Sequence, residues 1–333
     1  MKGFESGYQE KVGILITNLG TPDNPDAKSL RKYLKQFLSD KRVVDYNRLL
    51  WWLILNIIIL NVRPRKSAKL YESIWTDKGS PLLVNMQSIV KKLQSKNKDV
   101  HIKLGMRYGN PSIEEALNYF KNKNIFKILV LPLYPQAGSP TNSSTFDEIS
   151  RVLNGWPWLP NLRFVNGYHD HDDYILAVSN SIKKSTSNCD DIEKIIFSFH
   201  GMPVRYLNEG DPYYCFCHKT ARLVAERLKL SEDKYILSFQ SRFGSEEWLQ
   251  PYIDDEIVRL AKNGVKNLHI ISPGFSVDCL ETLEEIKIQY DELFKENGGD
   301  SLTYIPCLND HNDHIELIDK LIKVNMSDWR NEK

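Results

Sequence analysis

Short apolar runs rich in β-branched residues alternate along the chain with amphipathic stretches. Such runs predict buried strands, and the amphipathic stretches between them predict helices. We expect strands at residues 12–18, 101–106, 127–133, 162–165, 194–199, 235–239, 268–272 and 302–305. The helices expected between them include residues 29–38, 112–120, 220–228, 246–260 and 281–295. This alternation predicts an α/β fold in which helices cover both faces of parallel sheets.

The two halves of the chain carry similar motifs in the same order. The first predicted strand of each half ends in a similar triplet, Asn18-Leu19-Gly20 and Phe199-His200-Gly201. Further along, Met106-Arg107-Tyr108-Gly109 is matched by Ser241-Arg242-Phe243-Gly244. We therefore predict two similar α/β lobes, over residues 1–170 and 171–333. Because open α/β sheets bind ligands at the carboxyl ends of their strands, we expect the site in the cleft between the lobes.

Composition and charge narrow the class of protein. The 333 residues include 44 basic and 43 acidic ones, and the net charge of +1 gives no electrostatic basis for binding nucleic acid. The five cysteines are odd in number and irregularly spaced, which favours a reducing compartment over a disulfide framework. The N-terminus lacks the apolar segment of a secretory signal, and no apolar run is long enough to span a bilayer. We expect a cytoplasmic protein.

Common nucleotide and hydrolase signatures are missing from the sequence. Neither a GxxxxGKS/T phosphate loop nor a GxGxxG motif after a strand occurs, which argues against a nucleotide cofactor. GxSxG and HExxH are absent as well, which weakens hydrolase and zinc-protease interpretations.

His200 is the first candidate for chemistry. It ends an apolar predicted strand, and Gly201 leaves room beside its ring. An imidazole at the carboxyl end of a strand can accept a proton near neutral pH or ligate a metal. The alternative is a histidine that is satisfied by loop backbone.

The second candidate is the acidic segment at residues 278–285, which also follows a predicted strand. Glu281 and Glu285 are four residues apart and share one helix face, with Gln289 one turn further. Stacked carboxylates of this kind suit the passage of cations or protons. The alternative is that Asp278 and Glu281 form a capping box, with the other acids on a solvated face.

Three further polar clusters are weaker candidates. The run at residues 168–173 could hold a metal, but it fits the linker and N-cap of the next helix better. His311 and His314 are expected in an exposed first helical turn. Cys215, Cys217 and His218 lack the second half of a zinc site, so a structural or incidental role is favoured over a metal site or cluster.

Residues 49–60 form an apolar stretch that is too short to span a bilayer and too apolar for a solvated loop. It is followed by a group of basic residues, Arg63, Arg65, Lys66 and Lys69. This pairing is typical of an interfacial segment beside anionic groups, and it also suits a flat apolar ligand that carries carboxylates. The alternative is a buried core helix.

Several motifs together resemble ferrochelatases, in particular the protoporphyrin ferrochelatases of proteobacteria. In the second half these motifs are Ser198-Phe199-His200-Gly201-Met202-Pro203, Gly210-Asp211-Pro212-Tyr213, Gln240-Ser241-Arg242-Phe243-Gly244 and Leu280-Glu281-Thr282-Leu283. In the first half they are Asn18-Leu19-Gly20-Thr21-Pro22, Gly79-Ser80-Pro81-Leu82, Met106-Arg107-Tyr108 and Leu133-Tyr134-Pro135-Gln136. The resemblance extends over residues 11–325, in a consistent order.

The resemblance implies a lyase that inserts Fe²⁺ into protoporphyrin IX, makes haem b and releases two protons. It implies two Rossmann-like lobes around a porphyrin cleft, with residues 49–60 as a hydrophobic lip that meets the membrane surface in some members. Protoporphyrin IX and Fe²⁺ are then the substrates, and no cofactor is expected. The chain stops at Lys333 without a cysteine-rich extension, so we expect no iron–sulfur cluster.

Site roles follow from the same resemblance. His200 and Glu281 match the residues that take pyrrole protons and contact the metal from opposite sides of the macrocycle. Asp278 and Glu285 match neighbours that support this acid and conduct protons or metal. The positions that match porphyrin-pocket residues are Leu19, Arg63, Tyr71, Ser80, Arg107 and Tyr134.

Two departures and two alternatives accompany this interpretation. Cys279 stands where relatives often carry a histidine or another polar residue, and Gln289 stands where an acid continues the carboxylate row. One alternative is a chelatase for coproporphyrin III or another tetrapyrrole. The other is a porphyrin-binding protein without activity, although a paired base and acid argue against it.

Overall fold

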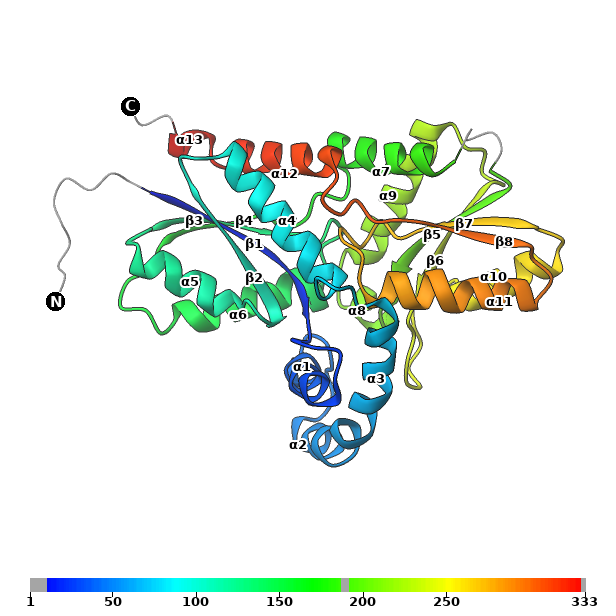
Figure 1. Ribbon diagram of the computed structural model, residues 1–333, viewed down its shortest axis with the longest axis horizontal. Helices are drawn as coiled ribbons and strands as arrows, with labels where there is room; N and C mark the ends of the chain where they lie inside the picture. The colour runs from blue at the N-terminus through cyan, green and yellow to red at the C-terminus, as the bar shows by residue number, and fades with distance from the viewer. Residues whose placement is uncertain (1–10, 187–191, 331–333) are drawn as a thin grey trace.

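Two parallel sheets of four strands each form the frame of the molecule (Figure 1). The computed structural model describes residues 11–186 and 192–330. The strand orders are β2-β1-β3-β4 and β6-β5-β7-β8, so both sheets have the same topology. The strands are β1 (Val12–Thr21), β2 (His101–Gly109), β3 (Lys127–Pro132), β4 (Asn161–Phe164), β5 (Lys194–His200), β6 (Tyr235–Gln240), β7 (Asn267–Ile271) and β8 (Ser301–Ile305). The predicted strands and the two similar α/β lobes are confirmed.

The largest difference between the N-terminal sheet and the prediction is that β1 and β2 continue three residues further than expected. Their added ends pair Gly20 with Tyr108 and Thr21 with Gly109. Gly20 has a φ of +111°, and a Cβ there would lie 1.7 Å from the Tyr108 carbonyl oxygen. Only glycine permits this close approach.

Helices cover the sheets and form a separate projection. The helices of the first half are α1 (Ala27–Ser39), α2 (Arg48–Leu53), α3 (Leu60–Ile74), α4 (Pro81–Lys96), α5 (Ile113–Asn122) and α6 (Ser144–Leu153), with the π-helices η1 (Ile54–Ile59) and η2 (Ser139–Ser143). Those of the second half are α7 (Asp172–Ser185), α8 (Val204–Asn208), α9 (Tyr213–Leu228), α10 (Ile253–Lys262), α11 (Asp291–Glu296), α12 (Asn312–Asn325) and α13 (Ser327–Arg330), with the π-helix η4 (Glu281–Tyr290).

One predicted helix, over residues 246–260, is wrong in its first half. The observed helix α10 begins at Ile253. Pro251 explains the difference, because proline disfavours the helical conformation of the residue before it and donates no N–H to a helix.

Each sheet has one face with its own core and one face in a shared core. In the N-terminal lobe the core that belongs to this lobe alone lies under α5 and α6, around residues such as Leu15 and Phe120. In the C-terminal lobe it lies under α10, η4 and α11, around residues such as Ile270 and Phe294. The shared core runs through both lobes, and α4, α7, α9 and α12 contribute to it.

The end of the chain crosses back over the N-terminal lobe (Figure 1). Helix α12 packs against α4 as well as α7. Arg163 of β4 is paired with Asp328 and lies 4.1 Å from the centre of the Trp329 ring. The division of the chain at residues 170 and 171 remains a prediction, and helices from both sides of it pack together in the shared core.

Helices α1, α2 and α3 project from the N-terminal lobe below the two sheets (Figure 1). They enclose a hydrophobic core of their own, the lip cluster, whose buried members are Leu30, Tyr33, Leu34, Leu38, Val44, Trp51, Leu55, Leu60, Ala68, Tyr71, Ile74 and Tyr108. The expected lip at residues 49–60 is the outer end of this projection. It is partly buried through Trp51 and Leu55, whereas Leu49, Trp52 and Ile57 are each more than half exposed.

None of the helices in the described part of the chain combines the length and apolar character needed to cross a membrane.

Candidate active site

His200 is the last residue of β5, as predicted, and its ring is partly exposed. Its Nδ1 lies 2.7 Å from the carbonyl oxygen of Gly201. A carbonyl can only accept a hydrogen bond, so this contact assigns the proton of the neutral ring to Nδ1. The lone pair of Nε2 is then available to accept a proton or bind a metal. The hydroxyl of Tyr213 donates to the backbone carbonyl of His200 (3.0 Å) and fixes the end of the strand.

Gly201 is required beside this histidine because the backbone of β6 and a tryptophan approach closely. A Cβ at this position would lie 2.8 Å from the Gln240 carbonyl oxygen and 2.9 Å from the Trp248 ring. The Gly201 N–H donates to the same Gln240 carbonyl (2.7 Å). The small residue therefore lets the strand end keep its pairing where His200 projects.

Gln240 connects His200 to the acidic helix. It pairs with His200 across β5 and β6. Its side-chain Nε2 donates to the carbonyl of Glu281 (3.0 Å) and to Glu285 Oε2 (3.3 Å), and its Oε1 accepts from Ser198 (2.6 Å). Gln240 is 1% exposed, and both the nitrogen and the oxygen of its side-chain amide form hydrogen bonds. It places the first residue of η4 at the same sheet edge as His200.

Glu281 begins η4 and acts electrostatically on tyrosines of the N-terminal lobe. Burial raises the pKa of Tyr71, and the charge of Glu281 adds to this effect. Burial likewise raises the pKa of Tyr33 and Tyr134, with smaller contributions from Glu281. Burial and Glu281 also raise the pKa of the Cys279 thiol, which therefore stays protonated at neutral pH. The Glu281 carboxylate therefore lies close enough to these tyrosines to affect their ionisation.

Asp278 is anchored in the protein and forms no capping box with Glu281. Its buried carboxylate accepts hydrogen bonds from Asn309 Nδ2 (2.7 Å), the Cys307 N–H (3.1 Å) and the Tyr304 hydroxyl. The N-terminus of η4 has no side-chain cap. The capping-box alternative is therefore wrong, because the carboxylate bonds to β8 and the segment after it, and to the Thr282 hydroxyl of η4 (3.3 Å), rather than acting as an N-cap.

Glu285 is anchored as firmly as Asp278. Its carboxylate accepts from the Ser241 N–H (3.1 Å), the Ser241 hydroxyl (2.5 Å) and the Tyr290 hydroxyl (2.8 Å), in addition to Gln240. A path for protons or metal through Asp278 and Glu285 remains a prediction, and it would require some of these donors to be displaced.

The acidic segment is a π-helix, which changes the predicted row of side chains. In a π-helix the backbone bonds run from residue i to i+5. Accordingly Gln289 bonds to Glu284 (2.8 Å to each oxygen) and Tyr290 bonds to Glu285, both five residues apart. The α-helical spacing predicted that Gln289 continues a row from Glu281 through Glu285. In the structure Gln289 bonds to Glu284 instead, so this row is not formed.

Ser276 joins the N-terminal lobe to this helix. Its hydroxyl donates to the carbonyl of Leu133 (2.8 Å) and accepts from Asn18 Nδ2 (3.3 Å). Asn18 precedes Leu19 and Leu133 precedes Tyr134, so two predicted porphyrin residues are brought to the segment that leads into Glu281.

The predicted porphyrin residues occupy different environments. Leu19 packs against the lip cluster, Tyr71 is a buried member of it, and Leu280 and Leu283 of the acidic segment pack against it too. Ser80 is buried and accepts a hydrogen bond from Thr21 (2.9 Å). Leu19 and Tyr71 therefore share the lip cluster with two residues of the acidic segment.

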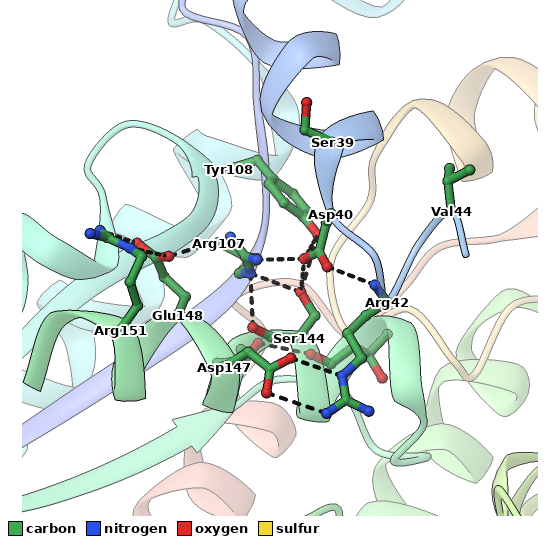
Figure 2. A network of polar contacts seen from close by, with 12 residues as sticks. Ser39, Asp40, Arg42, Val44, Arg107, Tyr108, Ser144, Asp147, Glu148 and Arg151 are labelled. Carbon is green, nitrogen blue, oxygen red and sulfur yellow. Dashed lines mark hydrogen bonds and ion pairs between the residues drawn. The ribbon is translucent and has the colours of Figure 1, made fainter. Parts of the chain in front are cut away.

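The two predicted arginines differ. Arg63 lies on the exposed surface of α3. Arg107 instead points into the protein, where it is paired with Asp40 and its Nε donates to Ser144 (Figure 2). No local signal indicates this partner, because Asp40 lies 67 residues from Arg107 along the chain.

A polar cavity of about 510 Å³ lies elsewhere, beside the base of the lip. It is bounded by the loop after α1, the loop after β3 and the loop before α9, and Arg42, Ser139, Tyr206 and Asp211 contribute to its lining. None of the predicted site residues lines this cavity.

The remaining predicted clusters lie apart from these residues, and two of them have structural contacts. His171 caps α7 by accepting the N–H of Asp173 (3.3 Å), as expected for residues 168–173. His314 was expected to be exposed, but it is fully buried, because α12 turns this face toward the segment at Asn309, whose carbonyl contacts Nδ1 (2.5 Å). Cys215 is exposed and Cys217 buried. Within residues 11–186 and 192–330, no three His, Cys, Asp or Glu side chains are grouped as metal ligands.

Comparison with known proteins decides the family. The family model for ferrochelatase matches residues 11–326. Ferrochelatase of Idiomarina loihiensis is 47% identical over 332 residues, which cover 98% of this chain and 91% of that protein. Ferrochelatase 2 of Shewanella oneidensis is 50% identical over 317 residues, which cover 94% of this chain and 97% of that protein. The chain belongs to the ferrochelatase family.

Members of the ferrochelatase family insert iron into a porphyrin in haem synthesis, and the predicted class of enzyme is thereby confirmed. Among solved structures, SirB from Bacillus subtilis with Fe³⁺ is similar, with a TM-score of 0.60 and 12% identity over 96% of this chain and 98% of that chain. The sirohydrochlorin chelatase SirB from Bacillus subtilis subspecies spizizenii in complex with cobalt has a TM-score of 0.58 at 11% identity, over 97% of each chain. These likenesses confirm the two-lobed chelatase fold.

Sequence reasoning missed several residues that shape the ferrochelatase site. Gln240 and Tyr213 occur in motifs that were noted, but their contacts to Glu281 and His200 need the folded structure. Tyr33 had no signal beyond an apolar helical pattern. The sequence offers one usable signal for Gln240. It follows a predicted strand, as His200 does, so the two residues are expected at the same edge of the sheet.

Proposed function

We propose that the chain inserts Fe²⁺ into protoporphyrin IX to form haem b. Family membership supplies the reaction, and the lip supports the choice of porphyrin. The exposed apolar surface of residues 49–60 continues into the lip cluster, which reaches Leu280 and Leu283 on either side of Glu281. Such an apolar wall suits the vinyl and methyl edge of protoporphyrin, because burying apolar surface stabilises a complex by about 25 cal/mol per Å².

Insertion exchanges two pyrrole protons for one Fe²⁺, so a neutral porphyrin core becomes a neutral metalated core and two protons are released. His200 accepts a pyrrole proton at Nε2, because its Nδ1–H is held by the Gly201 carbonyl. Its partial exposure lets the proton pass on to solvent. Glu281 receives the second proton or the incoming iron on the side of the tyrosines. Binding of the ring faces distorts the macrocycle toward the geometry of insertion, an effect on the order of 1–5 kcal/mol.

Asp278 and Glu285 position Glu281 in this scheme. Their carboxylates hold the start and the middle of η4 through donors from the segments after β6 and β8. Glu281 is thus set at the start of a helix that is held at two points.

Anaerobic absorbance assays test this function. Purified protein is mixed with protoporphyrin IX and Fe²⁺ or Zn²⁺, with His200→Ala and the exposed His311→Ala as a matched pair. We expect turnover by the wild type and by His311→Ala, and a loss of at least about 100-fold in His200→Ala. Unchanged turnover in His200→Ala would contradict the assigned base.

The same assay separates protoporphyrin IX from coproporphyrin III. Coproporphyrin III has two additional carboxylates, whose burial against an apolar wall is costly. We expect kcat/KM to be at least about tenfold higher for protoporphyrin IX, which corresponds to about 1.4 kcal/mol. A preference for coproporphyrin III would move the assignment to a coproporphyrin chelatase.

We also propose that the lip contacts the surface of an anionic membrane. Leu49, Trp52 and Ile57 are exposed, and the basic residues of α3 follow them, so apolar insertion and charge attraction act together. Co-sedimentation with phosphatidylcholine vesicles, with and without phosphatidylglycerol, tests this contact. Trp52→Ser and Ile57→Ser should weaken vesicle binding about tenfold, whereas Leu159→Ser, an equally exposed apolar residue outside the lip, should not. Equal binding by all variants would exclude the lip as the contact.

A further inference from the structure

Asp40 stands where α1 ends and the chain turns into the lip, and it is the centre of a buried polar network (Figure 2). Only 5% of its side chain is exposed. The carboxylate accepts hydrogen bonds from Ser144 Oγ (2.6 Å), the Tyr108 hydroxyl (2.8 Å), the Arg42 N–H (2.8 Å) and the guanidinium of Arg107. One carboxylate therefore ties the lip to β2 and to the start of α6.

Arg107 is the counterion in this network. Its Nε donates to the carbonyl and the hydroxyl of Ser144 (2.9 and 2.8 Å), its Nη1 lies 3.9 Å from Glu148, and its guanidinium lies over the Tyr108 ring (4.5 Å). Its donors are thus directed into the protein. Burial opposes ionisation of Asp40, but the hydrogen bonds of Ser144 and Arg42 and the charge of Arg107 outweigh it and lower the pKa of that carboxyl.

The network reaches the predicted porphyrin pocket through a chain of aromatic rings. Tyr108 meets Phe37 edge to face (5.2 Å between ring centres), Phe37 stacks on Tyr33 (6.1 Å), and Tyr33 meets Tyr71 (6.5 Å). Tyr71 is one of the residues expected to line the pocket. A shift of Tyr108 is therefore transmitted to Tyr71 through packed rings, since well-packed cores pass on such movements.

The root of the lip depends on the same helix end. Trp51 Nε1 donates to the carbonyl of Leu38 (2.6 Å), and Arg48 donates to the carbonyl of Ser39 (2.7 Å). Both acceptors lie in the last turn of α1, directly before Asp40. The position of α2 relative to the sheet is therefore set by the place where Asp40 is held.

We propose that Asp40 is a positioning residue for the porphyrin site, with Arg107 as its buried counterion and not as a ligand of the porphyrin. This proposal rests on the proposed function, because it assigns the pocket behind the lip to a porphyrin. Asp40 touches no reacting atom. It holds the end of α1, and through α1 it sets the lip and the Tyr108-to-Tyr71 wall.

The test compares Asp40→Asn with Asp45→Asn. Asp45 lies in the same loop but is 59% exposed and pairs with Arg205 on the surface (3.1 Å), so it is a matched control. Porphyrin binding is measured without metal by quenching of tryptophan fluorescence, and KM and kcat by Zn²⁺ insertion. For Asp40→Asn we expect porphyrin affinity to fall and porphyrin KM to rise about tenfold, with kcat and the KM for metal within about twofold. Asp45→Asn should match the wild type.

Two more variants keep the outcome clear. Asp40→Asn with Arg107→Gln removes both charges and should bind porphyrin better than Asp40→Asn alone, because no uncompensated buried charge remains. Weaker binding by the double variant would instead identify Arg107 as a porphyrin ligand and overturn the assignment. If Asp40→Asn does not fold, Ser144→Ala removes one donor and leaves both charges, and should weaken binding about threefold.

Wild-type porphyrin affinity in a folded Asp40→Asn, or in Ser144→Ala, would overturn the proposal. A wild type that binds porphyrin and inserts no metal would refute the proposed function, while the binding measurement would still decide the role of Asp40.

Discussion

Arg107 and Arg242 occupy equivalent motifs in the two lobes, and each lies over the ring of a tyrosine. Arg107 is 15% exposed and lies on the buried carboxylate of Asp40. Arg242 is 41% exposed and pairs with Asp254 on the surface (2.8 Å). The lip makes the difference, because it is inserted after β1 and brings Asp40 to the first arginine. The arginine of this motif therefore holds the lip to the sheet in the N-terminal lobe. Its equivalent in the C-terminal lobe forms an ion pair on the surface.

The strand ends show a second difference of this kind. Leu19 and His200 are the middle residues of equivalent triplets. Leu19 packs against the lip cluster, whereas His200 is the imidazole that we propose as the proton acceptor. The repeated fold thus places equivalent strand ends in both lobes, and the side chain at each strand end determines its chemistry.

The largest expected effect comes from exchanging these two side chains for alanine. His200→Ala removes the base and should lower kcat by about 10²–10⁴-fold. Leu19→Ala removes an apolar contact and should mainly raise the KM for porphyrin, by about tenfold. Steady-state kinetics of Zn²⁺ insertion measure both. If Leu19→Ala lost kcat and kept its KM, the division of tasks between the lobes would be incorrect.

Arg107→Gln tests the buried half of the arginine comparison. It leaves the Asp40 carboxylate buried without its counterion, and breaking such a pair costs about 3–5 kcal/mol. Chemical denaturation should show this fall in the free energy of unfolding. A loss below about 1 kcal/mol would mean that Asp40 is satisfied by its hydroxyl and amide donors alone.

The buried His314 tests how far the two lobes depend on each other. It lies on α12, which packs against helices from both halves of the chain. Burial lowers the pKa of His314 from 6.5 to about 4. The unfolded chain therefore binds a proton that the folded protein excludes, and stability falls as pH drops from about 6.5 toward 4. The loss should approach about 3 kcal/mol at pH 4.

Denaturation at a series of pH values in His314→Gln measures that contribution, with the exposed His311→Gln as the control. The His314 variant should show a flatter profile between pH 6.5 and 4, and the His311 variant the wild-type profile. Identical profiles for wild type and His314→Gln would show that this histidine does not govern acid stability.

Arg242→Gln is the smallest expected effect. Exposed ion pairs contribute about 0–1 kcal/mol, and salt screens them. The free energy of unfolding should therefore change by less than about 1 kcal/mol, and the change should shrink further in high salt. A loss as large as that of Arg107→Gln would remove the distinction between the two lobes.

Much of the frame was predictable from the sequence, because strand-forming runs and the internal repeat are local or periodic signals. The strand positions, the place of His200 at a strand end and the two lobes follow from them. The helix expected at residues 246–260 was too long, because the effect of Pro251 outweighs an otherwise helical pattern.

Contacts between distant segments were not predictable in the same way. Asp40 meets Arg107 across a sequence separation of 67 residues, and nothing local marks it as a counterion. The π-helical spacing of η4 changes which side chains meet, and a pattern interpreted with 3.6 residues per turn cannot show it. His314 was misplaced because its burial is imposed by packing and not by its neighbours in sequence.

The shared core has a mechanical consequence. A hinge that opened the cleft by rotating one lobe against the other would have to shear interdigitated side chains of α4, α7, α9 and α12 and expose them to water. The lip helices have a core of their own, apart from that joint. We therefore expect the flat substrate to enter and the product to leave at the lip. The lip helices would move locally, while the two sheets and their shared core keep their arrangement.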